Sequence, residues 1–182
     1  VWIDAFEAFA RIAYTTAARI TTLYAANQGF QTALGAAPEK LQVIANGIRL
    51  DRFAALPARA PGGRPTAALL GRVVPIKDIA AFVEAAAIVR REIPDVSMPV
   101  MGPTDEDPGY FEECRRLVEE RGLAGTVRFT GRVDIFEALP TIDVLCLTSI
   151  SEAQPLSILE AGAARIPCVA TDVGSCRELI EG

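Results

Sequence analysis

Apolar and polar residues alternate with two different periods along most of the chain, starting at Thr66. Short apolar runs, typical of buried strands, are separated by stretches whose apolar residues recur every three or four positions, as on one helix face. The predicted strands are 66–70, 96–101, 126–129, 144–148 and 168–171. The predicted helices are 78–91, 108–121, 135–139, 155–164 and 175–180. This alternation predicts an α/β fold, a doubly wound parallel sheet with helices on both faces.

The first 55 residues repeat the alternation on a smaller scale. The predicted elements are a helix over 1–19, a strand over 20–24, a helix over 27–34 and a strand over 41–44. We expect Asn27 to cap the second helix and Gly35 to end it. The stretch 56–65 (LPARAPGGRP) is rich in proline and glycine and lacks periodicity, as linkers do. We therefore predict the remnant of an N-terminal domain at 1–55, a linker at 56–65 and a ligand-binding domain at 66–182.

Composition and charge narrow the kinds of partner. The chain is 51% hydrophobic and 23% charged, as in packed globular proteins, and its net charge of −5 argues against nucleic acid as a general partner. There are four cysteines, none in a C-x-x-C pair, and no histidine, so we expect no zinc site and no Ser-His-Asp chemistry. We expect free thiols in a reducing compartment, hence a cytoplasmic location.

A ligand site is predicted where the strand order of such a sheet reverses. With the order 3-2-1-4-5, the crevice lies at the carboxyl ends of strands 66–70 and 144–148. Arg72 and Lys77 follow the first of these strands, and Pro155 follows the second, at the expected first position of a helix. The free amides of that helix favour an anion. Two cations facing a helix N-terminus predict a clamp for a diphosphate.

Two carboxylates near this clamp refine the ligand. Glu152 lies in the loop after the strand, and Glu160 lies inside the following helix. Carboxylates accept hydrogen bonds from adjacent hydroxyls, so the pattern favours a diphosphate with a ribose at one end and a sugar at the other. The alternative is that these four residues are solvated surface charges. The sequence has neither G-x-x-x-x-G-K-[ST] nor G-x-G-x-x-G, which disfavours a P-loop and a dinucleotide site.

The pattern G-R-x4-K at 71–77 and the pattern E-x7-E at 152–160 together resemble the retaining glycosyltransferases of the GT-B fold, family four, the glycosyl transferases group 1. The resemblance covers about 41–182 and implies a Rossmann-like C-terminal donor domain, truncated at its C-terminus. The strings GRVVPIKDI and LTSISEAQPLSILEAGAARIPCVATDVGSCREL are similar to the cytosolic subfamily of bacterial Pel exopolysaccharide systems. That subfamily implies a UDP-hexose donor, with UDP-glucose the usual proposal.

The resemblance implies a role for each matching residue. Arg72 and Lys77 would bind the donor diphosphate and stabilise the leaving group. Glu152 would contact the donor sugar near the reacting carbon, completing the catalytic set. Glu160 would hold the ribose hydroxyls.

Backbone groups would complete the donor site. The amides of Leu156 and Ser157 would meet the distal phosphate, and Gly131 and Arg132 would lie along the base. Gly174 would allow a close approach near the donor, or would be an ordinary turn glycine.

The reaction implied is hexosyl transfer of the EC 2.4 type, with retention at the anomeric carbon and release of UDP, without a metal or other cofactor. The acceptor would be a polysaccharide or oligosaccharide, and partner proteins in a membrane complex are also implied. We expect this chain alone to bind donor but not to transfer sugar. We also expect a truncated first domain to leave apolar side chains in residues 1–24 without a core of their own. These side chains would pack on the donor domain or on a second copy in a homodimer.

Two other functions are compatible with this fold. A sugar-nucleotide epimerase, or a phosphorylase-like enzyme, would use the same kind of domain, although the absence of histidine weighs against an epimerase. A non-catalytic nucleotide-sugar module is the second, although the retention of all four charged residues of the predicted site weighs against it.

Overall fold

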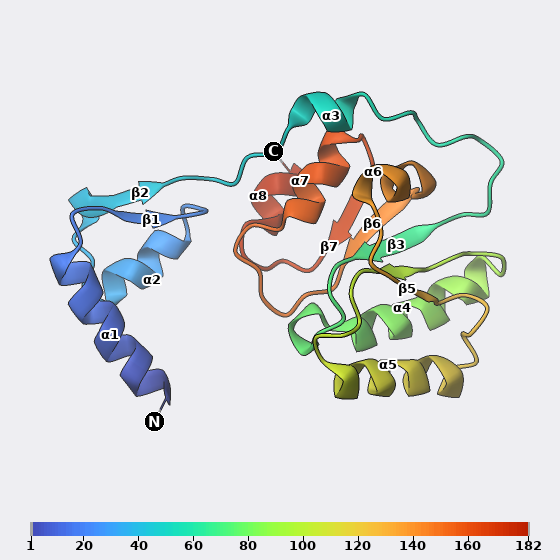
Figure 1. Cartoon of the computed structure of the whole chain (residues 1–182), viewed down its shortest axis with the longest axis horizontal. Coiled ribbons are helices and arrows are strands. Elements are labelled where there is room, and N and C mark those ends of the chain that lie inside the picture. Colours follow the sequence, from blue (N-terminus) through green and yellow to red (C-terminus); the bar gives the residue numbers. More distant parts are fainter. Residues whose placement is uncertain (1, 182) are drawn as a thin grey trace. The chain divides into compact units, whose positions relative to one another are not determined.

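The computed structural model describes residues 2–181, which divide into two compact units between Gly47 and Ile48 (Figure 1). This division falls before the predicted linker. The reason is that the short helix α3 (Leu50–Ala54) packs into the second unit, where Phe53 is buried against Leu139 and Ile142. The helix therefore belongs to the second unit by its contacts, although the sequence assigned it to the first.

The first unit is a small α/β layer with two helices and two strands. Its elements are α1 (Trp2–Thr16), β1 (Ile20–Thr22), α2 (Asn27–Ala33) and β2 (Leu41–Val43), and the two strands pair in parallel. The predicted cap is wrong, because Ala26 holds the N-cap position of α2 and the Asn27 amide instead donates to the Thr22 hydroxyl at 2.7 Å. Phe6 and Phe9 of α1 are 70% and 72% exposed, so the expected apolar surface is present.

The second unit contains the parallel sheet that the sequence predicts. Its strands are β3 (Ala67–Leu70), β4 (Val100–Met101), β5 (Phe129–Gly131), β6 (Val144–Leu147) and β7 (Cys168–Ala170). They lie in the order β5-β4-β3-β6-β7, and every neighbouring pair is parallel. The predicted order and the doubly wound α/β class are therefore confirmed. Strand β4 is shorter than predicted, and Pro99, which has no N–H to donate, lies just before it.

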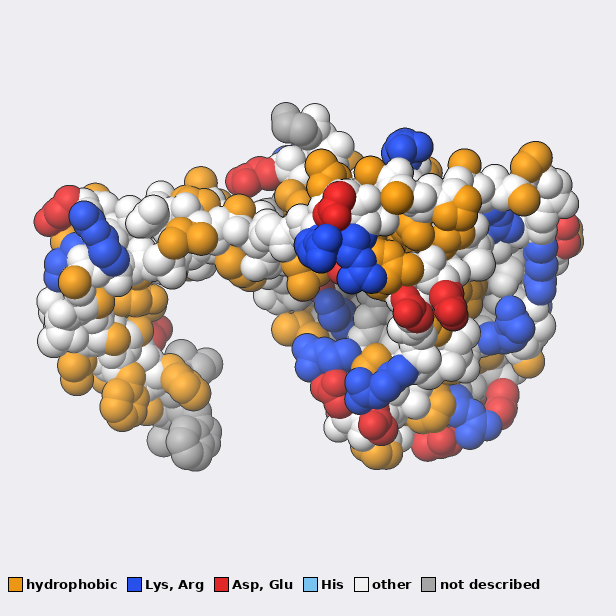
Figure 2. Space-filling model, turned by 45° about the horizontal axis from the view of Figure 1, so that its top comes forward, with side chains coloured by type: hydrophobic (Ala, Val, Ile, Leu, Met, Phe, Trp, Pro, Cys, Tyr) orange, Lys and Arg blue, Asp and Glu red, His pale blue; other side chains and the backbone are white. Residues whose placement is uncertain are grey.

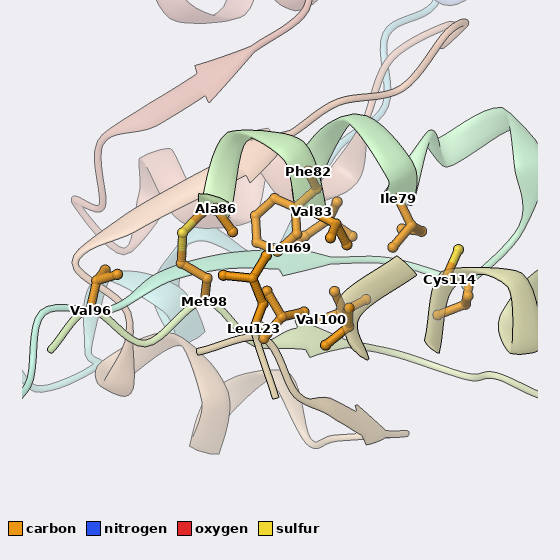
Figure 3. Close-up of a cluster of buried hydrophobic side chains, with 13 residues drawn as sticks. Leu69, Ile79, Phe82, Val83, Ala86, Val96, Met98, Val100, Cys114 and Leu123 are labelled. Atoms are coloured by element: carbon orange, nitrogen blue, oxygen red, sulfur yellow. The ribbon is translucent and has the colours of Figure 1, made fainter. Parts of the chain in front are cut away.

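Helices cover both faces of this sheet (Figure 1). The remaining elements are α4 (Ile79–Glu92), α5 (Pro108–Glu120), α6 (Ile135–Ala138), α7 (Leu156–Ala163) and α8 (Cys176–Glu181). Leu69 and Val100 point from the sheet into a core with Phe82 and Val83 of α4 and Cys114 of α5 (Figure 3). This core fixes the loops that leave the carboxyl ends of β3 and β4.

The opposite face is covered by the helices of the second half. Leu145 and Leu147 of β6 pack against Ile158 and Ala161 of α7 and against Cys176 at the start of α8. Alternate residues of β6 thus face α7, which sets the position of the α7 N-terminus beside the carboxyl ends of the strands. On the surface of the second unit, basic and acidic side chains are interleaved (Figure 2).

Candidate functional site

A pocket of about 390 Å³ lies at the carboxyl ends of β3 and β4, beside the crevice that the strand order predicts between β3 and β6. Four predicted donor-binding residues line it: Arg72, Arg132, Ser157 and Glu160. They come from three loops or helices that are far apart in sequence, and the fold brings them to one edge of the sheet. The fold thus brings these four residues together, whereas Lys77 and Glu152 are not among the described lining residues of the pocket.

The floor of this pocket depends on a close approach of two backbones. A Cβ atom at Gly102 would lie 2.0 Å from the carbonyl oxygen of Gly71, well inside contact distance. Only glycine therefore permits the segment after β4 to pass so near the segment after β3. Both glycines line the pocket.

The two arginines of the pocket are paired with one acidic loop between β4 and α5. Arg72 Nη1 donates to Glu106 Oε2 at 2.8 Å, and Arg132 Nη2 lies 3.5 Å from Asp105 Oδ1. These pairs are substantially exposed, so they are weak and can be exchanged for another anion. Sequence reasoning missed Asp105 and Glu106, although an acidic run in the loop between a strand and a helix was a signal.

Lys77 and Glu152 form a separate, more buried network. Lys77 ends a 3₁₀ turn (Pro75–Lys77), and its Nζ donates to Glu152 Oε1 at 2.5 Å. The side chains are only 17% and 13% exposed. The sequence predicted that Lys77 would face the ligand together with Arg72, but the structure pairs it with Glu152, the residue expected to contact the sugar.

A serine that sequence reasoning missed completes this network. Ser149 is buried, and its Oγ donates to the same Glu152 Oε1 at 2.6 Å. Thr148 Oγ1 donates to the carbonyls of Lys77 and Asp78, which ties the end of β6 to the start of α4. Asp78 has a left-handed backbone with φ of 45° and caps α4 by accepting from the Ala81 amide.

Helix α7 contributes its N-terminal turn to the site. Pro155 holds the N-cap position with an extended ψ of 120°. The helix therefore begins at Leu156, one residue later than predicted. The first amides of a helix have no partner within the helix and can bind an anion. Ser157 lines the pocket and Leu156 is half exposed, whereas Glu160 is partly buried, and burial raises the pKa of its carboxyl.

The predicted glycines have different outcomes. Gly131 ends β5 with φ of 72° and places Arg132 at the pocket. Gly174 has φ of 56°, and a Cβ there would lie 2.1 Å from the carbonyl oxygen of Glu152. Gly174 is thus a close-approach glycine, but what it approaches is the loop that carries Glu152.

The described residues lack the features of a metal site, a disulfide and a membrane-spanning helix. Within residues 2–181, no cluster of three or more His, Cys, Asp and Glu residues could hold a metal ion. The four cysteines are free. None of the described helices is long and apolar enough to cross a membrane. A larger apolar groove of about 490 Å³ lies between α4 and β7, but no Lys or Arg is among its described lining residues.

The comparison with known families identifies the class of protein. The family model "Glycosyl transferases group 1" matches residues 64–182, which include the whole sheet and the pocket, and the chain belongs to this family. A second model, a domain of unknown function called DUF3492, matches residues 1–39.

Curated relatives are similar over most of this chain but are much longer. The D-inositol 3-phosphate glycosyltransferase of Streptomyces scabiei is 32% identical over 75% of this chain and 34% of its own length. The GDP-mannose-dependent alpha-(1-6)-phosphatidylinositol monomannoside mannosyltransferase of Mycobacterium tuberculosis is 30% identical over 84% of this chain and 43% of its own. The chain thus spans between a third and a half of these relatives.

Solved structures establish the fold. Anabaena Alr3699/HepE, crystallised with UDP and glucose, has a TM-score of 0.83 at 22% identity and covers 97% of this chain with 51% of its own. Sucrose-phosphate synthase from Thermosynechococcus elongatus has a TM-score of 0.80 at 21% identity, covering 96% of this chain with 46% of its own. The sheet is that of the Rossmann-like C-terminal domain of GT-B glycosyltransferases, as the sequence predicted.

Proposed function

We propose that this chain is the donor-binding part of a retaining hexosyltransferase that uses a UDP-hexose, with UDP-glucose as the first candidate. The observation that carries the proposal is the pocket in which Arg72, Arg132, Ser157 and Glu160 converge at the carboxyl edge of the sheet. Membership of the glycosyl transferases group 1 family supports the reaction class.

The chemistry of the pocket suits a nucleoside diphosphate. A guanidinium such as that of Arg72 binds phosphate oxygens through paired N–H donors, and the first amides of α7 add oriented donors and the positive end of the helix dipole. The Glu160 carboxylate accepts hydrogen bonds from ribose hydroxyls. Gly131 and Arg132 lie along the base, and the amides of Leu156 and Ser157 meet the distal phosphate.

Transfer would depend on stabilising the departing UDP. Arg72 and Lys77 neutralise charge that develops on the diphosphate as the bond to the anomeric carbon breaks, and such electrostatic stabilisation is usually the largest contribution to catalysis. Lys77 would release Glu152 to reach the phosphates, and Glu152 would then meet the donor sugar. The proposal includes neither a metal nor another cofactor.

The identity of the donor is the finer part of the proposal. HepE has been solved with UDP-glucose, whereas the mycobacterial relative is GDP-mannose-dependent by name. We assign UDP-glucose on the likeness of the 71–79 and 147–179 segments to the Pel subfamily. The same likeness suggests a cytoplasmic role in exopolysaccharide synthesis, with an oligosaccharide or polysaccharide acceptor and partner proteins in a membrane complex.

Calorimetry on the 182-residue chain tests this proposal. UDP should bind more tightly than GDP or ADP, and Arg72→Ala should weaken UDP binding by about tenfold or more, because a charge-assisted hydrogen bond to phosphate is lost. Failure of all three nucleotides to bind, or equal binding by the variant, would refute the clamp. Tighter binding of GDP than of UDP would mean that the donor is a GDP-hexose instead.

Because curated relatives are two to three times as long, we expect no sugar transfer by this chain alone, and turnover on an oligosaccharide acceptor would contradict that expectation.

A further inference from the structure

One oxygen of the Glu152 carboxylate accepts hydrogen bonds from two donors. Only one of these donors has a second role in the proposed function. Lys77 Nζ and Ser149 Oγ lie 2.5 Å and 2.6 Å from the same Glu152 Oε1. In the proposed function, Lys77 exchanges this carboxylate for the donor diphosphate. Ser149 is neutral and would have no reason to leave.

Ser149 is held in place by neighbours on both sides. Its side chain is buried, and its carbonyl oxygen accepts a hydrogen bond from Thr171 Oγ1 at 2.6 Å, just after β7. The next amide, that of Ile150, donates to the carbonyl of Ile76 at 2.9 Å, within the 3₁₀ turn that carries Lys77. The hydroxyl is therefore a fixed donor rather than a mobile surface group.

Loss of Lys77 alone would leave a poorly solvated charge. The Glu152 side chain is only 13% exposed, and a carboxylate in such a place is costly without a hydrogen-bond partner. A fixed hydroxyl reduces this cost and keeps one carboxylate oxygen in a defined direction. The second oxygen stays available to a ligand hydroxyl.

We infer that Ser149 is a positioning residue that holds the Glu152 carboxylate toward the donor sugar while Lys77 moves to the diphosphate. This inference rests on the proposed function for its ligand, but the contact itself does not. It assigns to Ser149 a part in sugar recognition, separate from binding of the nucleotide.

The test compares UDP and UDP-glucose binding by calorimetry in Ser149→Ala and the unaltered chain. The affinity for UDP should change by less than about threefold, whereas the affinity for UDP-glucose should fall by about tenfold, the usual effect of losing a hydrogen bond to a charged group. Ser97→Ala, a substitution of another buried serine outside the pocket, should change neither. Equal losses for both ligands would overturn the inference, since a merely structural role weakens both. If Ser149→Ala does not fold, the nearly isosteric Ser149→Cys should give an intermediate loss for UDP-glucose alone, and an equal loss for both ligands would again overturn the inference.

A crystal structure of Lys77→Ala separates this inference from the proposed function. Glu152 should keep its contact with Ser149 there and should lose its fixed direction in the Lys77→Ala/Ser149→Ala double variant. A Glu152 side chain that turns away from Ser149 in the single variant would overturn the inference, whatever the ligand. Lack of any preference for UDP-glucose over UDP in the unaltered chain would instead count against the proposed donor.

Discussion

At the scale of single residues, two cations in and beside the pocket are already paired with carboxylates. Arg72 is paired with Glu106, and Lys77 is paired with Glu152. Under the proposed function, a diphosphate would have to displace these carboxylates from the two cations. The exposed pair with Glu106 is easy to exchange, and the buried pair with Glu152 is held more firmly.

The exposed pair leads to a prediction about affinity. Glu106→Gln should raise the affinity for UDP by up to about fivefold, because exposed pairs of this kind are weak and the carboxylate also repels the ligand. Isothermal titration at low salt measures the change. Glu84→Gln is the matched control, since Glu84 forms a similarly exposed pair with Arg121 outside the pocket and should leave the affinity unchanged. A loss of affinity in Glu106→Gln would mean that Glu106 contacts the ligand directly.

The partly buried Glu160 should make both binding and stability depend on pH. Burial raises the pKa of its carboxyl above the ordinary value of 4.5, so the folded chain takes up a proton at a higher pH than the unfolded chain does. Between these two pKa values the folded state binds more protons, so the Glu160 contribution to stability is present at low pH and is lost as the pH rises through the raised pKa. UDP affinity should change in the opposite direction, because a protonated carboxyl loses acceptor capacity for ribose hydroxyls.

Glu160→Gln provides the measurement. This variant should lose the part of the pH dependence of UDP binding that lies above pH 4.5, and it should bind more weakly than the unaltered chain at neutral pH. Titration calorimetry at several pH values would show this. The same pH profile in both proteins would show that Glu160 does not contact the ribose.

At the scale of elements, the loop that carries Glu152 is supported by a glycine that faces its backbone. Gly174, before α8, lies against the carbonyl of Glu152, and the Ser175 amide donates to the Ala153 carbonyl at 3.0 Å. The turn before α8 therefore holds the loop that presents Glu152. The position of one helix start is thus linked to the geometry of the donor site.

Gly174→Ala tests this support. The added Cβ cannot fit 2.1 Å from the Glu152 carbonyl, and the left-handed backbone adds strain, so we expect a loss of about 1–3 kcal/mol in stability and weaker UDP-glucose binding. Gly162→Ala is the control, because no atom lies within 4 Å of its Cβ position and alanine favours a helix. That variant should be as stable as the unaltered chain or more so. Thermal unfolding and calorimetry distinguish the two results.

The order of elements was predictable, whereas the contacts between loops were not. The two periods of the apolar pattern predicted the strands and helices. The order of the strands in the sheet was then predictable because right-handed crossover connections leave few alternatives. Arg72 followed from that order and Glu160 from its place in the helix after β6, whereas Ser157 came from the family resemblance. The pairing of Lys77 with Glu152, and the Ser149 hydroxyl on the same carboxylate oxygen, depend on side-chain directions in two loops, which no periodicity encodes.

At the scale of the whole molecule, the boundary between the two units has consequences for stability. Phe53 lies before the predicted linker but is buried in the second unit, with its ring centroid 4.9 Å from that of Phe136. Sequence reasoning placed the boundary too late because a proline- and glycine-rich stretch resembles a linker even where it runs over a folded surface. Arg59 in that stretch pairs with Asp143 at 3.0 Å.

A shortened chain tests this boundary. Residues 48–182 should fold alone, and Phe53→Ala in that chain should lose about 3–5 kcal/mol of stability, the usual result of emptying a buried aromatic site. Urea unfolding measures the loss, and Leu50→Ala on the exposed side of the same helix should have little effect. Equal stability of 48–182 and 56–182 would show that α3 does not contribute to the fold.

The pocket draws every one of its lining residues from a continuous stretch between Leu70 and Glu160. Under the proposed function, the determinants of donor preference would then lie on one continuous segment of the chain. If the pocket binds the donor as proposed, a hybrid in which residues 48–182 replace the matching part of a longer relative should take its nucleotide preference from this chain and keep the acceptor preference of the relative.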